Sequence, residues 1–151
     1  MRVHTLERSQ RVPAPSDEVF GFYADAFNLE LITPPWLGFR VLTPGPIRMR
    51  PGTLIEYRLR LHGVPVRWVT RIEEWEAGRR FVDVQVRGPY RLWHHTHDFE
   101  AAADETIVSD RVRYALPLGP CGELARWAFV TRDLERIFRY RQTAVTTRFT
   151  K

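Results

Sequence analysis

Residues 54–116 alternate between apolar and polar side chains, and short turns interrupt the alternation at regular intervals. In the first stretch, Ile55, Tyr57 and Leu59 alternate with Glu56 and Arg58. A period of two places the two sets on opposite faces, which is typical of a half-buried antiparallel strand. The same pattern predicts strands over residues 54–61, 64–76, 81–87, 90–100 and 106–116. Consecutive strands with hairpin-length connections favour a curved antiparallel meander.

Further elements are predicted before the meander. Residues 2–12 are expected to form a first strand, and Ser16 is expected to cap a short helix. A second short helix over residues 25–32 stops at Thr33, because the proline after it denies that residue the helical backbone region. A brief strand at residues 39–42 then leads into the meander.

The period changes again after the Pro117–Gly122 segment. Apolar residues recur there at helical spacing and form one stripe, which comprises Leu124, Trp127, Ala128, Thr131, Leu134, Phe138, Val145 and Phe149. We predict one long amphipathic helix over about residues 120–148, with this stripe against the concave face of the sheet. A helix laid across a strongly bent sheet leaves a gap, and we expect that gap to be a ligand pocket.

The predicted strand over residues 90–100 separates its side chains into two different surfaces. One face carries Trp93, His95, His97 and Phe99. The other face carries Leu92, His94, Thr96 and Asp98. The first set is bulky, aromatic and able to form hydrogen bonds, which suits the wall of a ligand cavity. We therefore expect His95 and His97 to be buried near the pocket and His94 to be more exposed.

Composition and charge narrow the classes of function. At 151 residues the chain has the size of one domain, so we expect a single ligand-binding domain over residues 1–151. Cys121 is the only cysteine, which excludes an internal disulfide. The net charge is +5, but the arginines are scattered, and we expect no nucleic-acid partner. With neither a membrane-length apolar run nor an apolar signal segment at the start, we expect a cytoplasmic protein without integral membrane association.

The order of elements is that of the helix-grip fold. The features that carry a closer resemblance are Pro13–Phe20, Trp68, the Phe81-x-Asp83-x-Gln85 run with Gly88-Pro89, the Trp93–Phe99 alternation, and Asp110 with Tyr114 and Leu116-Pro117. The chain resembles bacterial SRPBCC (polyketide cyclase/dehydrase-like) domains of the START/Bet v1-like superfamily. The resemblance implies an α+β fold, in which a curved antiparallel sheet of about six to seven strands wraps round the C-terminal helix. It implies no single activity, because such relatives include lipid carriers, hormone receptors and aromatases.

The register of the hairpin between residues 81–87 and 90–100 stays open at this point. With two residues in its loop, Asp83 lies opposite His94 and faces outward; with three, it lies opposite His95 and faces inward. The resemblance favours the second alternative, with Asp83 and Gln85 facing inward.

Asp110 lies on an otherwise apolar face of the last predicted strand, with Val108, Val112 and Tyr114. If that face matches the Trp93–Phe99 face across the hairpin, Asp110 falls near His97. A buried carboxylate is costly unless it is paired, so an imidazole partner is physically reasonable. Such a pair is either a structural hydrogen bond that fixes two strands or part of a functional site.

His95 and His97 also have the spacing of two metal ligands on one face of a strand. Asp83, Asp110 and Glu74 are conceivable third ligands, but the sequence does not specify one. The relatives that the chain resembles are mostly metal-free, so we predict no metal and no other cofactor.

Two tryptophans are candidates for contacts with a ligand. Trp68 shares a strand face with Val66, Thr70 and Ile72, where it either packs in the core or stacks on a ring of the ligand. Trp36 follows two prolines, and it lies either at the mouth of the cavity or as a hydrophobic plug beside the short helices.

Two functions would use the same pocket. The first, which we favour, is binding or carriage of a small hydrophobic molecule (a lipid, a polyketide or an aromatic metabolite) by a monomer or homodimer. The expected wall of the pocket comprises Tyr57, Leu59, Trp68, Trp93, His95, His97, Phe99, Val112, Tyr114, Trp127 and Leu134. Asp83, Gln85 and Asp110 are expected to orient polar atoms of the ligand.

The alternative is an enzyme of the aromatase/cyclase or dehydratase type. Its candidate catalytic residues are His95, His97, Asp110, Asp83 and Tyr114. A histidine tuned by an aspartate would move protons, while Tyr114 or Gln85 held a carbonyl oxygen. The sequence offers no nucleophile with its base and no phosphate-binding glycine loop, so covalent catalysis and nucleotide use are unsupported.

Overall fold

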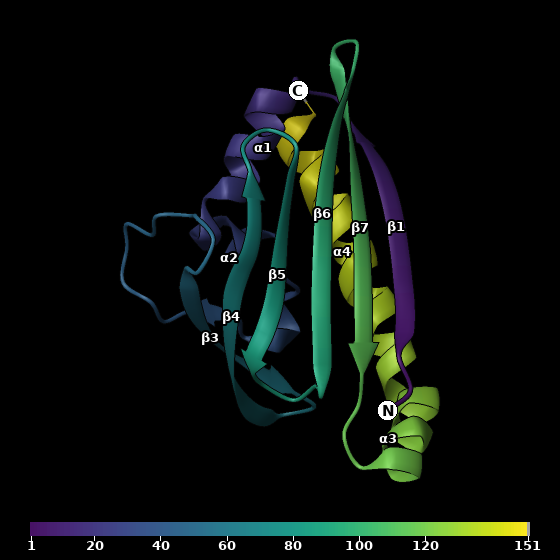
Figure 1. Ribbon diagram of the computed structural model, residues 1–151. Coiled ribbons are helices and arrows are strands. Elements are labelled where there is room, and N and C mark those ends of the chain that lie inside the picture. The colour runs from purple at the N-terminus through teal and green to yellow at the C-terminus, as the bar shows by residue number, and fades with distance from the viewer. Residues whose placement is uncertain (151) are drawn as a thin grey trace.

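The computed structural model describes residues 1–150 and contains one seven-stranded antiparallel sheet (Figure 1). Its strands are β1 (His4–Val12), β2 (Arg40–Val41), β3 (Leu54–Leu61), β4 (Val64–Glu76), β5 (Arg80–Arg87), β6 (Leu92–Ala102) and β7 (Glu105–Ala115). The strand order is β1-β7-β6-β5-β4-β3-β2, so β2 to β7 form a meander and β1 joins its edge beside β7. The predicted meander is confirmed.

Two sets of helical segments accompany the sheet. After β1 come α1 (Ser16–Ala24), the 3-10 turn η1 (Ala26–Asn28), α2 (Leu29–Ile32) and the 3-10 turn η2 (Pro35–Leu37). After β7 come α3 (Gly119–Ala125), the π-helical turn η3 (Arg126–Val130) and α4 (Thr131–Phe149). The whole has the predicted helix-grip fold. The prediction that Ser16 caps α1 is wrong, because Ser16 is already helical and Pro15 holds the cap position without a side-chain hydrogen bond.

Helix α4 runs along one face of the sheet, and the curved strands wrap round it (Figure 1). Side chains of β1 fix it there. The amide group of Gln10 donates to the carbonyl oxygen of Gln142 at 2.7 Å and to the hydroxyl of Thr146 at 2.9 Å. Arg8 donates to the carboxylate of Glu135 at 2.8 Å. These contacts fix the position of α4 along the edge strand of the sheet over several helical turns.

The predicted apolar stripe of the C-terminal helix is buried only in its second half. Leu134, Phe138 and Val145 are buried, whereas Leu124 is 65% exposed and Trp127 is 78% exposed. The prediction that these two residues cover the sheet is therefore wrong. The π-helical turn adds one residue to the turn, which rotates the residues before it by about 100° relative to α4. In addition, α3 lies beyond the end of the sheet (Figure 1).

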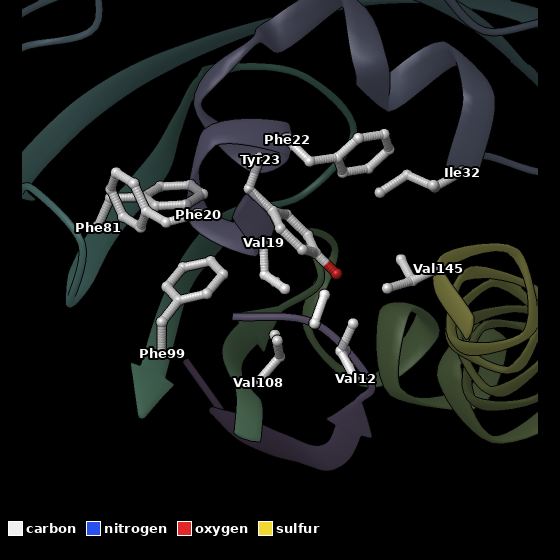
Figure 2. Close-up of a cluster of buried hydrophobic side chains, with 11 residues drawn as sticks. Val12, Val19, Phe20, Phe22, Tyr23, Ile32, Phe81, Phe99, Val108 and Val145 are labelled. Carbon is white, nitrogen blue, oxygen red and sulfur yellow. The ribbon is translucent and has the colours of Figure 1, made fainter. Parts of the chain in front are cut away.

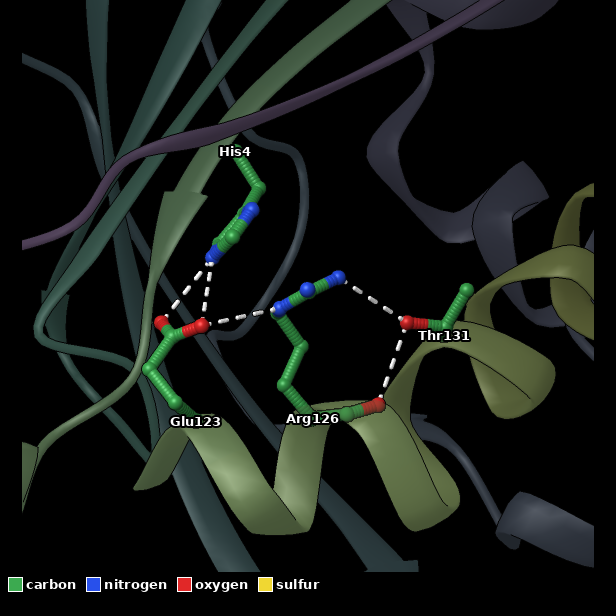
Figure 3. A network of polar contacts seen from close by, with 4 residues as sticks. All are labelled: His4, Glu123, Arg126 and Thr131. Atoms are coloured by element: carbon green, nitrogen blue, oxygen red, sulfur yellow. Dashed lines mark hydrogen bonds and ion pairs between the residues drawn. The ribbon is translucent and has the colours of Figure 1, made fainter. Parts of the chain in front are cut away.

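A polar network attaches α3 and η3 to the beginning of β1 (Figure 3). Nε2 of His4 lies 2.9 and 3.0 Å from the two carboxylate oxygens of Glu123. The guanidinium group of Arg126 donates to the same carboxylate and to the hydroxyl of Thr131, each at 3.3 Å. The network thus ties the first residue of α4 to the edge of the sheet through η3.

A cluster of buried apolar side chains fills one end of the space between the sheet and α4 (Figure 2). Phe20 and Tyr23 of α1 contact Phe99 of β6 edge-on, with ring centroids 5.1 and 5.2 Å apart. The buried members are Val12, Ala14, Val19, Phe20, Phe22, Tyr23, Ile32, Phe81, Phe99, Val108 and Val145. We call this set the core cluster, and it closes the space on the side of α1.

Candidate functional site

Beyond the core cluster, the space between the sheet and α4 contains a cavity of about 150 Å³. Most of its wall is apolar or aromatic. The predicted wall residues that do line it are Tyr57, Leu59, Trp68, Asp83, Trp93, His95, His97 and Leu134. Strands β3 to β6 supply the floor of the cavity, and α4 covers it.

The register of β5, β6 and β7 brings four ionisable side chains together. Asp83 lies opposite His95, and Asp110 lies opposite His97. His95 and His97 are each only 4% exposed, while His94 lies on the other face and is partly exposed. The predicted division of this strand is confirmed, and the inward register of Asp83 is the one adopted.

Asp83, His95, His97 and Asp110 form a connected network, which we call the His–Asp quartet. Nε2 of His97 lies 2.6 Å from Oδ2 of Asp83, and Nε2 of His95 lies 2.8 Å from Oδ1 of Asp110. Asp110 therefore faces His97 across the ladder but accepts its short hydrogen bond from His95, the diagonal neighbour. Nδ1 of His97 lies 3.4 Å from the same Asp110 oxygen, without the geometry of a hydrogen bond.

Ring stacking fixes the planes of the two imidazoles. The centroid of the His97 ring lies 3.7 Å from that of His95, with an angle of 25° between the rings. On its other side, His97 stacks on Phe81 at 4.0 Å and 14°. Since Phe81 belongs to the core cluster, the quartet lies at the boundary between the dry core and the cavity.

The surroundings favour a charge on one histidine and not on the other. Burial disfavours the imidazolium form of His97, but hydrogen bonding and the charges of Asp110 and Asp83 outweigh it and raise its pKa. Burial and the neighbouring His97 lower the pKa of His95 in spite of its bond to Asp110. Burial opposes ionisation of both aspartates, but their histidine partners hold the pKa of each below its usual range.

This pattern assigns the protons of His95. An ionised carboxylate only accepts, so Nε2 of His95 carries the hydrogen that is donated to Asp110. In the neutral imidazole, Nδ1 is then the ring nitrogen that can accept a hydrogen bond. Because His95 lines the cavity, the arrangement can orient a hydroxyl or amide of a ligand, or accept a proton from it.

Several residues predicted for the wall lie elsewhere. Phe99 belongs to the core cluster, and Val112 and Tyr114 belong to a neighbouring cluster with Leu134 and Phe138. Asp110 lies behind the two histidines and is not on the cavity wall. Trp127 is exposed because it lies in the π-helical turn, out of phase with the buried face of α4.

Gln85 stabilises a turn instead of facing the cavity. Its side-chain amide donates to the carbonyl oxygen of Tyr90 at 2.6 Å and its side-chain oxygen accepts from the Tyr90 backbone N–H at 3.0 Å. Both bonds lie within the β5–β6 connection. The ligand-orienting role predicted for Gln85 thus loses its geometric basis, although Tyr90 itself lines the cavity.

Other wall residues were not predicted from the sequence. Leu29, Thr33, Leu37 and Phe39 reach the cavity from the short helices and the loop after them. No periodic pattern marks such irregular segments. Arg141 of α4 also lines the cavity. Its place on the inner face of the helix was predictable from helical spacing, since it follows Leu134 by seven residues and Phe138 by three.

The tryptophans divide between the wall and the surface. Trp68 lines the cavity and meets Trp93 edge-on, with centroids 5.2 Å apart. Trp36 is 51% exposed and contacts Tyr140 and Arg136 of α4, outside the cavity wall. With half of its side chain exposed, Trp36 is not the hydrophobic plug that was one of its two predicted roles, and it is not among the residues that line the cavity.

One set of residues has the composition of a metal site. Asp83, His95 and His97 offer ligand atoms that all lie within 4.8 Å of one another. Two histidines and a carboxylate suit zinc or another first-row divalent ion. The Nε2 atom of each histidine is engaged by a carboxylate, so an ion held through either Nε2 atom would have to displace that short bond.

Comparison with known proteins assigns the family. Residues 12–139 match the family described as "Polyketide cyclase / dehydrase and lipid transport". The chain belongs to this family. Among curated proteins no sequence matches it. No helix within residues 1–150 has the length and apolar character needed to cross a membrane.

Solved structures share the fold of this polyketide cyclase/dehydrase family member at low sequence identity. The Zhui aromatase/cyclase from Streptomyces sp. R1128 superposes with a TM-score of 0.77 at 17% identity, over 97% of this chain and 93% of that one. A protein from Thermus thermophilus gives 0.71 at 19% identity, over 97% and 100%. A START superfamily protein from Mycobacterium smegmatis gives 0.67 at 13% identity, over 97% of each chain. At such identities the likeness concerns the fold alone.

Proposed function

We propose that this protein binds a small, largely aromatic molecule in the cavity between the sheet and α4. The observation that carries the proposal is the wall itself, in which aromatic and aliphatic side chains surround a few converging polar groups. Binding sites for small molecules have this composition. A dry cavity of about 150 Å³ is known to hold one aromatic ring, so the ligand part enclosed here is one or two rings in size.

The polar groups supply orientation. Nδ1 of His95 accepts a hydrogen bond from the ligand, and the hydroxyl of Tyr57 donates one, because burial beside Asp83 raises its pKa and keeps it protonated. A ligand with a hydroxyl and a carbonyl on a ring system would satisfy both groups. Family membership supports this class of ligand, since the family comprises polyketide cyclases and lipid transport proteins.

Native mass spectrometry of protein purified from its own host tests the proposal directly. We expect a non-covalent adduct whose mass fits a ligand with one or two rings. A fluorescence titration with 2-naphthol supplies a second readout, since Trp68 and Trp93 line the cavity. Absence of both an adduct and any saturable change in fluorescence would refute binding.

A second candidate function rests on the His95–Asp110 pair. A neutral histidine oriented by an aspartate is the arrangement of a general base, and the same fold occurs in an aromatase/cyclase. In this function His95 accepts a proton from a carbon or hydroxyl of a polyketide-like substrate. Turnover with a bell-shaped pH profile, lost in His95→Gln while naphthalene, which lacks the hydroxyl, still binds, would establish catalysis. Binding without turnover of such substrates would leave the carrier function.

A further inference from the structure

Arg141 is the arginine of the cavity wall, and the proposed function leaves it without a role. It lies on the buried face of α4, between Phe138 and Val145, and it lines the cavity. Its Nε atom is buried and has no hydrogen-bond partner within residues 1–150. Buried polar atoms are nearly always paired, and a guanidinium group without a partner is especially costly. Such an atom in a cavity wall indicates a missing acceptor.

The acidic groups nearby do not supply that acceptor. The carboxylate of Asp83 is paired with His97 at 2.6 Å, and the carboxylate of Asp110 is paired with His95 at 2.8 Å, so each already has a histidine partner. The positive charge of Arg141 acts on Asp83 and Tyr57 from a distance, without an ion pair. The guanidinium group lies over the face of Phe138, whose ring centre is 5.2 Å from the central carbon.

We propose that Arg141 binds a carboxylate of the ligand, so that the protein is selective for small aromatic acids. This inference rests on the proposed function and specifies its ligand class. A guanidinium group presents its N–H donors in a planar fork that matches the two oxygens of a carboxylate. The aromatic wall encloses the ring, and the cavity floor offers the acceptor of His95 to a hydroxyl at the far side of the ligand.

A matched pair of probes tests the selectivity. The 2-naphthoate anion and neutral 2-naphthamide have nearly the same shape, and both can be followed by tryptophan fluorescence and calorimetry. A hydrogen-bonded charge is worth enough to change affinity by roughly tenfold or more. The wild-type protein is expected to bind the acid at least tenfold more tightly than the amide.

Variants on α4 locate the effect. Arg141→Met keeps the length of the side chain and removes its charge, and it should abolish the preference for the acid while changing amide affinity less than threefold. Arg141→Lys keeps the charge without the fork and should retain a reduced preference. Arg139→Met, at an exposed position two residues away, serves as the matched control and should behave like the wild type.

The outcomes separate the two proposals. Equal affinity of the wild type for acid and amide, or equal losses for both probes in Arg141→Met, would overturn the role of Arg141 and leave the binding function intact. Failure of the wild type to bind either probe would overturn the selectivity for aromatic acids, and the absence of a native adduct as well would overturn the binding function. The wild-type comparison alone is decisive if a variant fails to fold, which circular dichroism shows.

Discussion

Replacement of Asp110 by asparagine should destabilise the protein strongly, although the two side chains have nearly the same size. The substitution keeps the shape of the side chain but removes the charge that accepts a 2.8 Å hydrogen bond from His95 and faces Nδ1 of His97 at 3.4 Å. Hydrogen bonds to charged groups contribute about 1.5–3 kcal/mol, and removal of one partner of a buried ion pair costs about 3–5 kcal/mol. Because asparagine retains one acceptor oxygen, we expect a loss of about 2–3 kcal/mol.

Urea unfolding at pH 7, followed by tryptophan fluorescence, measures this loss. For a chain of this length it corresponds to a decrease in Tm of about 4–12 °C. Asp98→Asn is the matched control, because Asp98 lies on the outer face of β6 and pairs with Arg80 at 2.6 Å in an exposed ion pair. Such pairs contribute at most about 1 kcal/mol. Equal destabilisation by the two substitutions would refute the importance that we assign to the quartet.

The pH dependence gives a second check on the same variant. The pKa of Asp110 is lower in the folded protein than its ordinary value of 3.8, so its contribution is complete above that value and is lost as the pH falls through the folded value. The difference in stability between wild type and Asp110→Asn should therefore be largest between about pH 4 and 6.5. It should shrink in acid, and it should also shrink as the pH rises through the folded value of His97, because Asp110 helps to raise the pKa of His97. A difference that grew as the pH fell below 3.8 would contradict the ion-pair explanation.

Three further predictions concern the two histidines of the quartet, the C-terminal helical segment and the candidate metal site. In a histidine NMR titration, the pKa of His97 should lie above 6.5 and that of His95 below it, and the reverse order would contradict the proposed charge pattern. The free energy of unfolding should fall as the pH rises through the pKa of His97, and also as the pH drops below 6.5, because His95 resists protonation in the folded protein. Phe138→Ala should lower the free energy of unfolding in urea by about 3 kcal/mol, because Phe138 is buried. Trp127→Ser should change it by less than about 0.5 kcal/mol, because Trp127 is exposed, and similar losses in the two variants would show that Trp127 is covered. Elemental analysis of protein from its own host should find no stoichiometric metal, whereas one zinc per chain that His95→Gln removes would establish an ion site at the quartet.

The fold could be predicted from the sequence to the extent that side chains repeat with a fixed period. The alternation through Ile55, Tyr57 and Leu59 defines β3, and the same logic places His95 and His97 on the inner face of β6. The register of β5 against β6 could not be obtained in this way, because the loop length decides it. The Gln85 side chain stabilises that connection through the backbone of Tyr90, and no periodic pattern reveals such a contact.

The residue range of the C-terminal helix was easier to predict than the direction in which its side chains point. A single period of 3.6 residues over residues 120–148 places Trp127 with Phe138, but the π-helical turn between them breaks the phase. The partner of Asp110 was also only partly predictable, since pairing across the ladder points to His97 whereas side-chain reach favours His95. Arg141 was not among the predicted wall residues, although it follows Phe138 by three residues and so lies near it on the helix.

The quartet and Arg141 reside on opposite walls, and this separation bears on how such a protein changes its ligand in evolution or in the laboratory. The His–Asp quartet is built on β5, β6 and β7, three neighbouring strands that backbone hydrogen bonds lock together. Arg141, Ile137 and Phe138 all belong to α4, which is one continuous segment. Exchange of this segment alone would alter the size and charge of the cavity, whereas the hydrogen bonds of the quartet, which lie entirely within the strands, would be kept.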